Sequence, residues 1–175
     1  MYIKKLLFFT TVIVLSLSIT GCGSFRSELF ARDDKKIADT RFQEITEALE
    51  NKDKEALKKL FSPNALKEAK EIDGSIDYIM NFYKEKLKSM KGTQSGSGSN
   101  DHGKKTSELN GFYRVTTDND KYIIFFVDNI KDTENVGLYM LQIIKESDRE
   151  KYFDGGGDKT RCAGIFIPSD NNVVN

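Results

Sequence analysis

The chain has 175 residues, of which 38% are hydrophobic and 31% charged, with no tryptophan and two prolines. This length predicts one domain, and the composition is ordinary for a globular protein. The formal charge is zero; without residues 1–21, which hold Lys4 and Lys5 but no acid, 25 basic residues stand against 27 acidic ones. A weakly acidic body lacks the basic surface that nucleic-acid binding requires, so we exclude that class.

The N-terminus resembles the signal sequence of a bacterial lipoprotein. Lys4 and Lys5 precede an uncharged apolar run over residues 6–19, which is shorter than the ~20 residues of a membrane-spanning helix. The run ends in I-T-G-C, with two small residues before Cys22, as in a lipobox. We therefore expect a signal peptide over residues 1–21, lipid on Cys22, and a location on the extracytoplasmic face of the cell membrane. The alternatives are an uncleaved anchor and a cysteine that follows a secretory signal by chance.

Cys162 is the second of the two cysteines. If Cys22 carries lipid, Cys162 is unpaired, and its place before the apolar run 163–167 predicts a buried and inert thiol. A disulfide between the two cysteines would require that Cys22 is not acylated. A cysteine nucleophile would need a neighbouring base, and His102 is the single histidine of the chain.

Helices are predicted for the first half of the mature chain. Residues 22–32 read as the lipidated N-terminus and a polar tether. Helical periodicity begins near Asp33, and its apolar residues recur at spacings of 4, 3 and 4: Ala38, Phe42, Ile45 and Leu49. This spacing predicts one buried helix face.

Three shorter helical segments follow. Asp53 can cap a helix over residues 54–61, and Ser62-Pro63 reads as an N-cap followed by proline at the first helical position. Gly74-Ser75 begins a third helix, whose apolar residues share one face: Ile76, Ile79, Met80 and Tyr83.

The second half of the chain reads as strands, because its apolar residues recur with a period of two. Aromatic and β-branched residues gather in segments 112–117, 122–128, 138–145 and 164–167, with 87–91 as a possible first strand. Polar turns separate them. Helices followed by antiparallel strands predict an α+β domain over residues 33–168, with helices on one face of a curved, mainly antiparallel sheet of four to five strands. Residues 169–175 form a C-terminal tail.

The two central strands, residues 122–128 and 138–145, are apolar on both faces. Helices can cover only one face of the sheet. The other face must therefore meet a second copy, another segment of the chain or a ligand. Of these three, we expect a homodimer through the sheet face.

Several stretches together resemble a known family. They are the lipobox, N-K-D-K-E-A-L-K-K-L-F-S-P-N-A-L-K-E-A at Asn51–Ala69, S-N-D-H-G-K-K at Ser99–Lys105 and N-V-G-L-Y at Asn135–Tyr139. They look like domain-of-unknown-function family 5104, a group of Gram-positive lipoproteins, over about residues 33–168. The resemblance implies a nuclear-transport-factor-two-like (cystatin-like) cone, in which a curved sheet wraps around a long helix and leaves a pocket. It implies no catalytic residues, and relatives with this fold either catalyse reactions or only bind ligands.

Residues 92–106 nearly spell a phosphate-binding loop. Gly98, Gly103 and Lys104 fit G-x-x-x-x-G-K-[ST], but Lys105 occupies the Ser/Thr position. No buried strand precedes this segment and no amphipathic helix follows it. We therefore reject nucleotide binding and predict a long Gly/Ser connection between the first strand and the main sheet.

His102 in this segment is the candidate for acid–base catalysis. Asp101, Asp128 or Glu108 could be its carboxylate partner, although adjacent residues of an extended segment point to opposite sides. A solvated loop histidine is the simpler interpretation. One histidine among scattered carboxylates lacks the spacing of a metal site, and residues 154–158 lack the alternating acids of a calcium loop, so we expect no metal and no cofactor.

Four residues are candidates for the lining of a ligand pocket: Phe112, Phe125, Tyr139 and Met140. Plain core is the alternative interpretation of such residues at strand spacing. The sequence thus favours a membrane-anchored lipoprotein whose extracytoplasmic domain binds a ligand or a protein without catalysis. The alternative is a small pocket enzyme of the isomerase, dehydratase or hydrolase type that uses His102 with a carboxylate.

Overall fold

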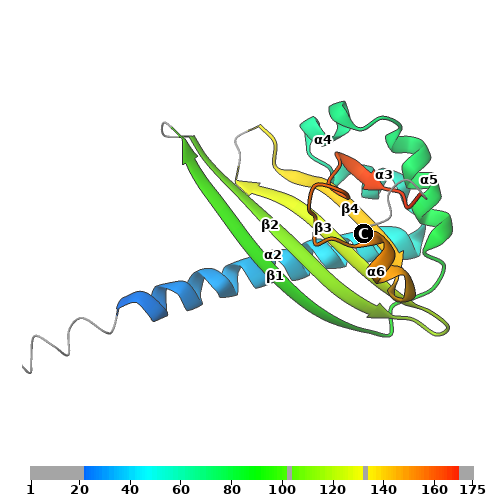
Figure 1. Ribbon diagram of the computed structural model, residues 1–175, viewed down its shortest axis with the longest axis horizontal. Coiled ribbons are helices and arrows are strands. Elements are labelled where there is room, and N and C mark those ends of the chain that lie inside the picture. Colours follow the sequence, from blue (N-terminus) through cyan, green and yellow to red (C-terminus); the bar gives the residue numbers. More distant parts are fainter. Residues whose placement is uncertain (1–21, 102–103, 132–133, 170–175) are drawn as a thin grey trace, which may run out of the picture. The chain divides into compact units, whose positions relative to one another are not determined.

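Four helices, α2 to α5, come before the five strands of one sheet (Figure 1). The computed structural model describes residues 22–101, 104–131 and 134–169. The chain divides between Asp34 and Lys35 into two units, and the sheet and its core belong to the second. Helices followed by a mostly antiparallel sheet confirm the predicted α+β fold class.

α2 (Cys22–Asn51) contains the buried helix face that the periodicity predicts. All four predicted residues are fully buried: Ala38, Phe42, Ile45 and Leu49. The helix already includes Cys22, the first described residue, whereas the sequence predicts helix only from near Asp33. Residues 24–32 contain no glycine or proline that would interrupt a helix. Across the described residues, no helix is both long and apolar enough to span a membrane.

The short helices begin at the predicted caps. Asp53 accepts a hydrogen bond from the backbone N–H of Ala56 at 2.8 Å and opens α3 (Lys54–Lys59). Ser62 accepts from the N–H of Ala65 at 3.2 Å and opens α4 (Pro63–Glu68). Satisfying these otherwise unpaired donors is what makes the two residues effective caps. α5 (Ile72–Phe82) begins two residues before the predicted start at Gly74, and it buries Ile76, Ile79 and Met80.

The sheet follows chain order. β1 (Ser89–Asp101), β2 (Lys104–Thr116), β3 (Lys121–Lys131) and β4 (Gly137–Lys145) pair antiparallel in sequence, and β5 (Gly164–Phe166) pairs parallel with β4. The consecutive antiparallel strands need only short connections, in agreement with the predicted polar turns.

The Gly/Ser segment is a strand, so its prediction as a connection is wrong. β1 pairs with β2 along its whole length, from Ser89 opposite Thr116 to Asp101 opposite Lys104. Residues 102–103, and with them His102, lie outside the described residues. Glycine and serine have low strand propensity, but a complete backbone ladder to a β-rich neighbour outweighs that preference.

Two glycines of the sheet accommodate aromatic rings. Gly92 lies opposite Tyr113, and Gly111 lies opposite Phe126. A Cβ atom on either glycine would lie 2.2 Å from the ring opposite. Tyr113 stacks on Phe42 of α2 with ring centroids 4.2 Å apart, and on Phe126 at 6.0 Å. The glycines therefore leave room for an aromatic stack that joins the sheet to α2.

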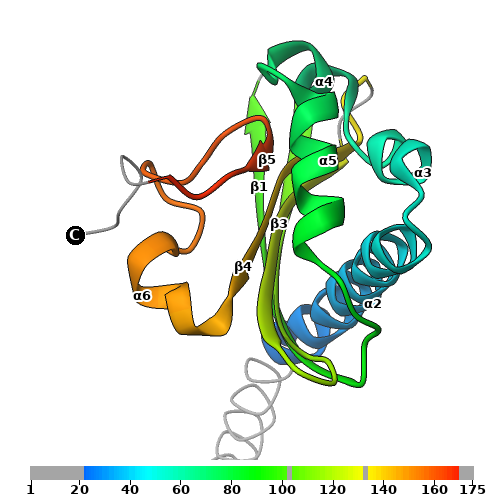
Figure 2. The same cartoon turned by 90° about the vertical axis from the view of Figure 1, so that its right-hand side faces the viewer.

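Both faces of the sheet are covered by the chain itself (Figure 2). The part of α2 from Lys35 onward and α5 cover the face that contains Phe126. The opposite face contains Phe125 and Met140 and is covered by the segment that runs through η1 (Glu146–Asp148) and α6 (Arg149–Tyr152) towards β5. Of the three covers that the sequence leaves open, another segment of the chain is the one observed. The dimer expected through this face stays a prediction. The apolar residues that motivated it are covered by the chain itself.

A backbone joint ties the short helices to β4. Phe61 forms a parallel bridge with Leu138. Ser62 N donates to Leu138 O at 2.9 Å, and Leu138 N donates to Leu60 O at 2.8 Å. Gly137 has a φ of +127°, and a Cβ atom there would lie 2.7 Å from Leu60 O. The joint therefore requires glycine at this position.

Glu85, which lies between α5 and β1, holds the turn between β2 and β3. Its carboxylate accepts hydrogen bonds from Thr117 Oγ1 at 2.5 Å, from Asn119 N at 2.9 Å and from Asn119 Nδ2 at 2.6 Å. These hydrogen bonds lower the pKa of Glu85 to about 2, and the bond from Thr117 has the largest effect. The ionised carboxylate thus favours the folded state.

We expect Glu85→Gln to remove part of the acid sensitivity of folding. The pKa of Glu85 is lowered on folding, so its contribution is complete above the ordinary value of 4.5 and is lost as the pH falls through about 2. Urea midpoints of the wild type and the variant should differ at pH 7 and converge towards pH 2. Glu47→Gln, at an exposed position of α2, is the control and should show no such convergence. A difference for Glu85→Gln that stays constant with pH would contradict this role.

Candidate functional site

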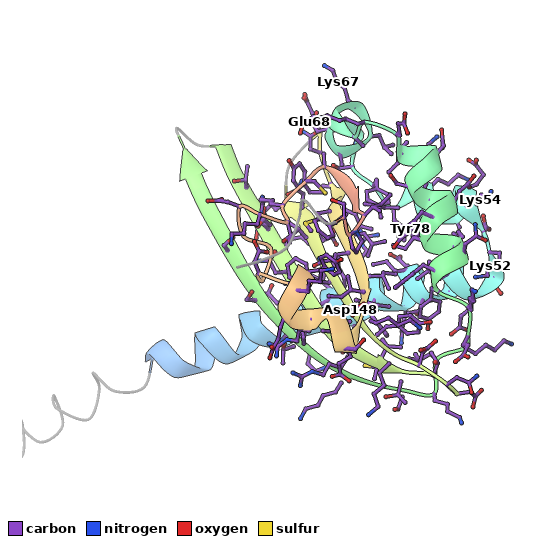
Figure 3. The ribbon with its side chains drawn as sticks, turned by 45° about the vertical axis from the view of Figure 1, so that its right-hand side comes forward. Lys52, Lys54, Lys67, Glu68, Tyr78 and Asp148 are labelled. Carbon is purple, nitrogen blue, oxygen red and sulfur yellow. The ribbon has the colours of Figure 1, made fainter. Side chains whose placement is uncertain are left out.

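A groove of about 640 Å³ opens between α4, α5 and the segment that leads into β5. Its lining comes from three parts of the chain: Glu68, Ala69, Lys70, Glu71, Ser75, Tyr139, Cys162, Ala163 and Ile165. Glu68 is the last residue of α4 (Figure 3). The volume is in the range of small-ligand sites. The carboxylates of Glu68 and Glu71 outnumber the ammonium group of Lys70, so the lining carries a negative charge.

Tyr139 lines the groove at a bulge of β4. Val127 of β3 pairs with Met140, but the next residue, Asp128, pairs with Leu138. Tyr139 is therefore the extra residue of β4, without a partner in the register. Bulges redirect a side chain relative to the regular alternation of a strand. This explains why Tyr139 contacts the clusters on both faces of the sheet.

Two charged neighbours surround the ring of Tyr139. The guanidinium carbon of Arg161 lies 5.3 Å from the ring centroid, and the same guanidinium donates to the carboxylate of Glu108 on β2, with Nη2 2.5 Å from Oε2. Burial raises the pKa of Tyr139, and the charge of Glu68 and a hydrogen bond to it act in the same direction. At neutral pH Tyr139 is a protonated phenol that can donate a hydrogen bond.

Cys162 brings a thiol to the groove. It is unpaired and partly exposed, and burial raises its pKa to about 11. At neutral pH such a thiol is protonated and is a poor nucleophile. The predicted inert chemistry therefore agrees with the surroundings of Cys162, although the side chain is not fully buried.

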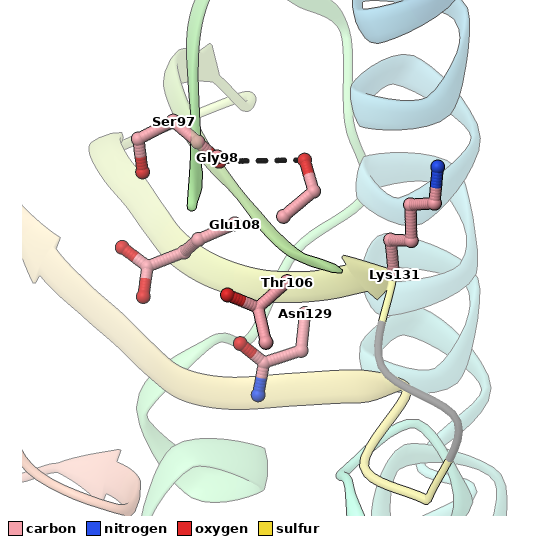
Figure 4. A pocket seen from close by; sticks show the side chains of 7 residues that line it. Ser97, Gly98, Thr106, Glu108, Asn129 and Lys131 are labelled. Atoms are coloured by element: carbon pink, nitrogen blue, oxygen red, sulfur yellow. Dashed lines mark hydrogen bonds between the residues drawn. The ribbon is translucent and has the colours of Figure 1, made fainter. Parts of the chain in front are cut away.

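A second pocket, of about 360 Å³, lies at the strands β1, β2 and β3 (Figure 4). Its lining is Ser97, Gly98, Thr106, Ser107, Glu108, Asn129 and Lys131. Ser107 Oγ donates to Ser97 O at 3.3 Å across the hairpin. The lining contains no apolar side chain apart from the stems of its polar residues. Because ligand sites combine an apolar surface with a few polar groups, the larger groove is the stronger candidate.

The four residues predicted to line a pocket gather in one cluster, but the chain covers most of them. Phe125 and Met140 are 3% and 0% exposed. Phe153 packs over this cluster, with its ring centroid 5.1 Å from that of Phe112 and 5.4 Å from that of Phe125. Tyr139 is the one of the four that lines the groove. The structure uses the other three as core, because the segment after β4 folds back over them.

The residues predicted for acid–base chemistry are spread over the molecule. His102 lies outside the described residues, and Asp101 ends β1. Asp128 is on the helix-covered face, where it is 1% exposed and accepts a hydrogen bond from Arg41 Nε at 2.9 Å. Glu108 is bound by Arg161. Both Asp128 and Glu108 thus have cationic partners, and catalysis by His102 stays a prediction.

The glycine-rich segment after α6 forms a turn around Asp154. The carboxylate of Asp154 accepts hydrogen bonds from Gly157 N at 3.0 Å, from Lys159 N at 3.1 Å and from the hydroxyl of Thr160. Its oxygens are engaged within the turn, which agrees with the glycine-turn interpretation of this segment. In the three described ranges of the chain, no group of three His, Cys, Asp or Glu residues is arranged to hold a metal ion.

One protein family matches residues 44–146, which is more than half of the chain, and its description is Domain of unknown function (DUF5104). The chain belongs to this family. Among curated proteins, none matches the chain.

The DUF5104 match covers one side of the groove. It includes Glu68, Glu71 and Tyr139, and it ends before Cys162. It also includes the joint between Phe61 and Leu138. The two family-like runs at Asn51–Ala69 and Asn135–Tyr139 therefore contain the residues that form this joint. The match is shorter than the stretch over which the sequence resembles the family.

Sequence reasoning missed Glu68, Glu71 and Arg161 as residues at or beside the groove. Charged residues at exposed positions are usually solvated, and nothing in the spacing of these three distinguishes them. Glu68 and Arg161 are far apart in the chain. Both come next to Tyr139 only in the folded sheet, where β4 and β5 pair.

Proposed function

We propose that this DUF5104 protein is a lipoprotein, anchored through Cys22, that binds a small ligand at the extracytoplasmic face of the membrane without catalysing a reaction. The observation that carries the binding role is the groove of about 640 Å³ around Tyr139. The anchor is supported by the charged start, the apolar run and I-T-G-C before Cys22. The cystatin-like cone is part of the proposal and is supported by the α+β arrangement, with the part of α2 from Lys35 onward across one face of the sheet.

The chemistry of the lining favours a ligand with an ammonium group and an apolar body. Glu68 and Glu71 supply carboxylates that attract a cation. The ring of Tyr139, together with Ala163 and Ile165, supplies apolar contact area. The protonated thiol of Cys162 makes nucleophilic catalysis at this groove unfavourable at neutral pH. Recognition is therefore the role that these side chains support best.

One thiol-labelling experiment on the full chain tests the anchor. After expression in a Gram-positive host and denaturation of the membrane fraction, a maleimide mass tag should label a single cysteine, because lipid blocks the sulfur of Cys22. The Cys22→Ala protein should also take up one tag but should leave the membrane fraction. Two tags on the wild-type protein, or a Cys22→Ala protein that stays with the membrane, would overturn the anchor.

The same reagent tests the groove in the folded protein, because Cys162 lies in its lining. Millimolar 2-phenylethylamine should slow labelling of Cys162 at least twofold, whereas phenylacetate, with a similar ring and the opposite charge, should not. Glu68→Gln combined with Glu71→Gln should abolish the protection by the amine. Labelling that is unaffected by 2-phenylethylamine, or equally slowed by phenylacetate, would contradict a cation-binding groove.

A further inference from the structure

β1 forms one edge of the sheet, since it pairs with β2 and with no other described strand (Figure 1). Most residues in the middle of its length are exposed, including Thr93, Ser95, Ser97 and Gly98. An edge strand presents a row of backbone N–H and C=O groups along its outer side. These groups can hydrogen-bond to another extended chain.

This edge lacks the devices that normally prevent such pairing. Natural edge strands carry charged residues, proline or bulges that block the addition of another strand. Residues 92–100 contain no charge and no proline, and the ladder between β1 and β2 has no register shift. The charged residues of β1, Lys91 and Asp101, stand on either side of this run. The run is thus suited to accept a strand, and the charges at its two ends have opposite sign.

We propose that β1 pairs antiparallel with β1 of a second copy, so that one continuous sheet crosses both molecules. In an antiparallel pair of identical strands, a two-fold axis passes through the central pair. When Gly96 is opposite Gly96 of the partner subunit, Lys91 comes opposite Asp101 of the partner subunit, and the reverse pair forms at the other end. A slip by two residues loses both charge pairs. The ends of the strand therefore select this register, while the small residues between them allow close approach.

Charge complementarity is also the reason for choosing a second copy over an unrelated extended peptide. Opposite charges directly across two strands stabilise their pairing, and like charges oppose it. β1 contains both members of the required pairs, at matching distances from Gly96. The contact is a strand edge and is smaller than the ~800 Å² per partner of a standard stable interface. We therefore expect a weak dimer, which covalent trapping detects better than size measurements.

Cysteine cross-linking of the full chain in membranes of the expressing cells tests the register. In the proposed dimer, Gly96→Cys places two Cβ atoms about 5 Å apart, within reach of a disulfide. Thr93→Cys is the matched control: it is exposed on the same strand, but its two copies lie about 20 Å apart. Mild oxidation should give at least five times more disulfide-linked dimer for Gly96→Cys than for Thr93→Cys or the wild type. Equal cross-linking at the two positions would overturn the proposal.

A charge exchange tests the partner. In the Gly96→Cys protein, Lys91→Glu should lower the dimer yield at least fivefold, because it places an acid opposite Asp101 of the partner subunit. Asp101→Lys should do the same, and the double exchange should restore the yield. Failure of the double exchange to restore it would overturn the proposed register. Linkage of Gly96→Cys only to a different protein would overturn the choice of a second copy.

Discussion

Arg41→Met is expected to lower the free energy of unfolding by about 3–5 kcal/mol, because it leaves the carboxylate of Asp128 buried without its charge partner. The side chain of Asp128 is 1% exposed and that of Arg41 is 18% exposed. Arg41 Nε donates to Asp128 Oδ2 at 2.9 Å, and Asp128 Oδ1 has no hydrogen-bond partner among the described residues. Domains of ordinary stability unfold at a cost of about 5–15 kcal/mol, so this loss would be a large fraction of the total.

Two further variants separate this pair from its surroundings. Glu44→Gln removes the other carboxylate that Arg41 contacts, at 2.7 Å, but Glu44 is 45% exposed and should contribute about 0.5 kcal/mol or less. Arg41→Met with Asp128→Leu removes both charges and should recover most of the stability lost in Arg41→Met alone. Urea denaturation at pH 7 gives the three values. A loss below about 1 kcal/mol for Arg41→Met would contradict a desolvated pair.

Gly137→Ala is the second substitution with a large expected effect, about 3–5 kcal/mol. Two costs combine: a left-handed φ of +127° strains any other residue by about 1–3 kcal/mol, and overpacking adds a similar amount. The added Cβ would lie 2.7 Å from Leu60 O and 2.9 Å from Ser62 N, both backbone atoms that cannot rotate away. Since Gly137 is two residues from Tyr139, the same change should also disturb the groove.

Gly155→Ala is the matched control for this prediction. Gly155 also has a positive φ, +76°, but a Cβ atom there would meet nothing within 4 Å. Gly155→Ala should therefore lower the free energy of unfolding only by the cost of backbone strain, about 1–2 kcal/mol. Thermal or urea denaturation of both variants therefore isolates the contribution of the backbone clash. If Gly137→Ala and Gly155→Ala lowered the free energy of unfolding equally, the predicted backbone clash at the joint between Leu60 and β4 would be wrong.

The helical half of the fold could be predicted because its signals are local. The buried face of α2 follows from the spacing of four apolar residues, and both short helices begin at the predicted caps, Asp53 and Ser62. These patterns depend on residues three or four positions apart. The order of helices before antiparallel strands was likewise enough for the α+β class.

Strand β1 was not predictable from its own residues. Its glycines and serines favour a loop, and they become a strand because β2 offers a complete ladder of backbone partners. Gly92 is needed there because the ring of Tyr113 occupies the space of a side chain. Neither fact is visible before the register of the two strands is known.

The sequence by itself determined the α+β order, the helix faces and caps, and the apolar character of both sheet faces. Tertiary structure alone decided what covers the second face, and it placed Phe125 and Met140 under Phe153. It also assembled the groove, since Glu68 and Cys162 meet only around the bulge at Tyr139. The physical reason is the same in each case. Periodicity and capping act over a few residues, whereas strand register, face cover and cavity lining depend on which distant segments share a backbone ladder.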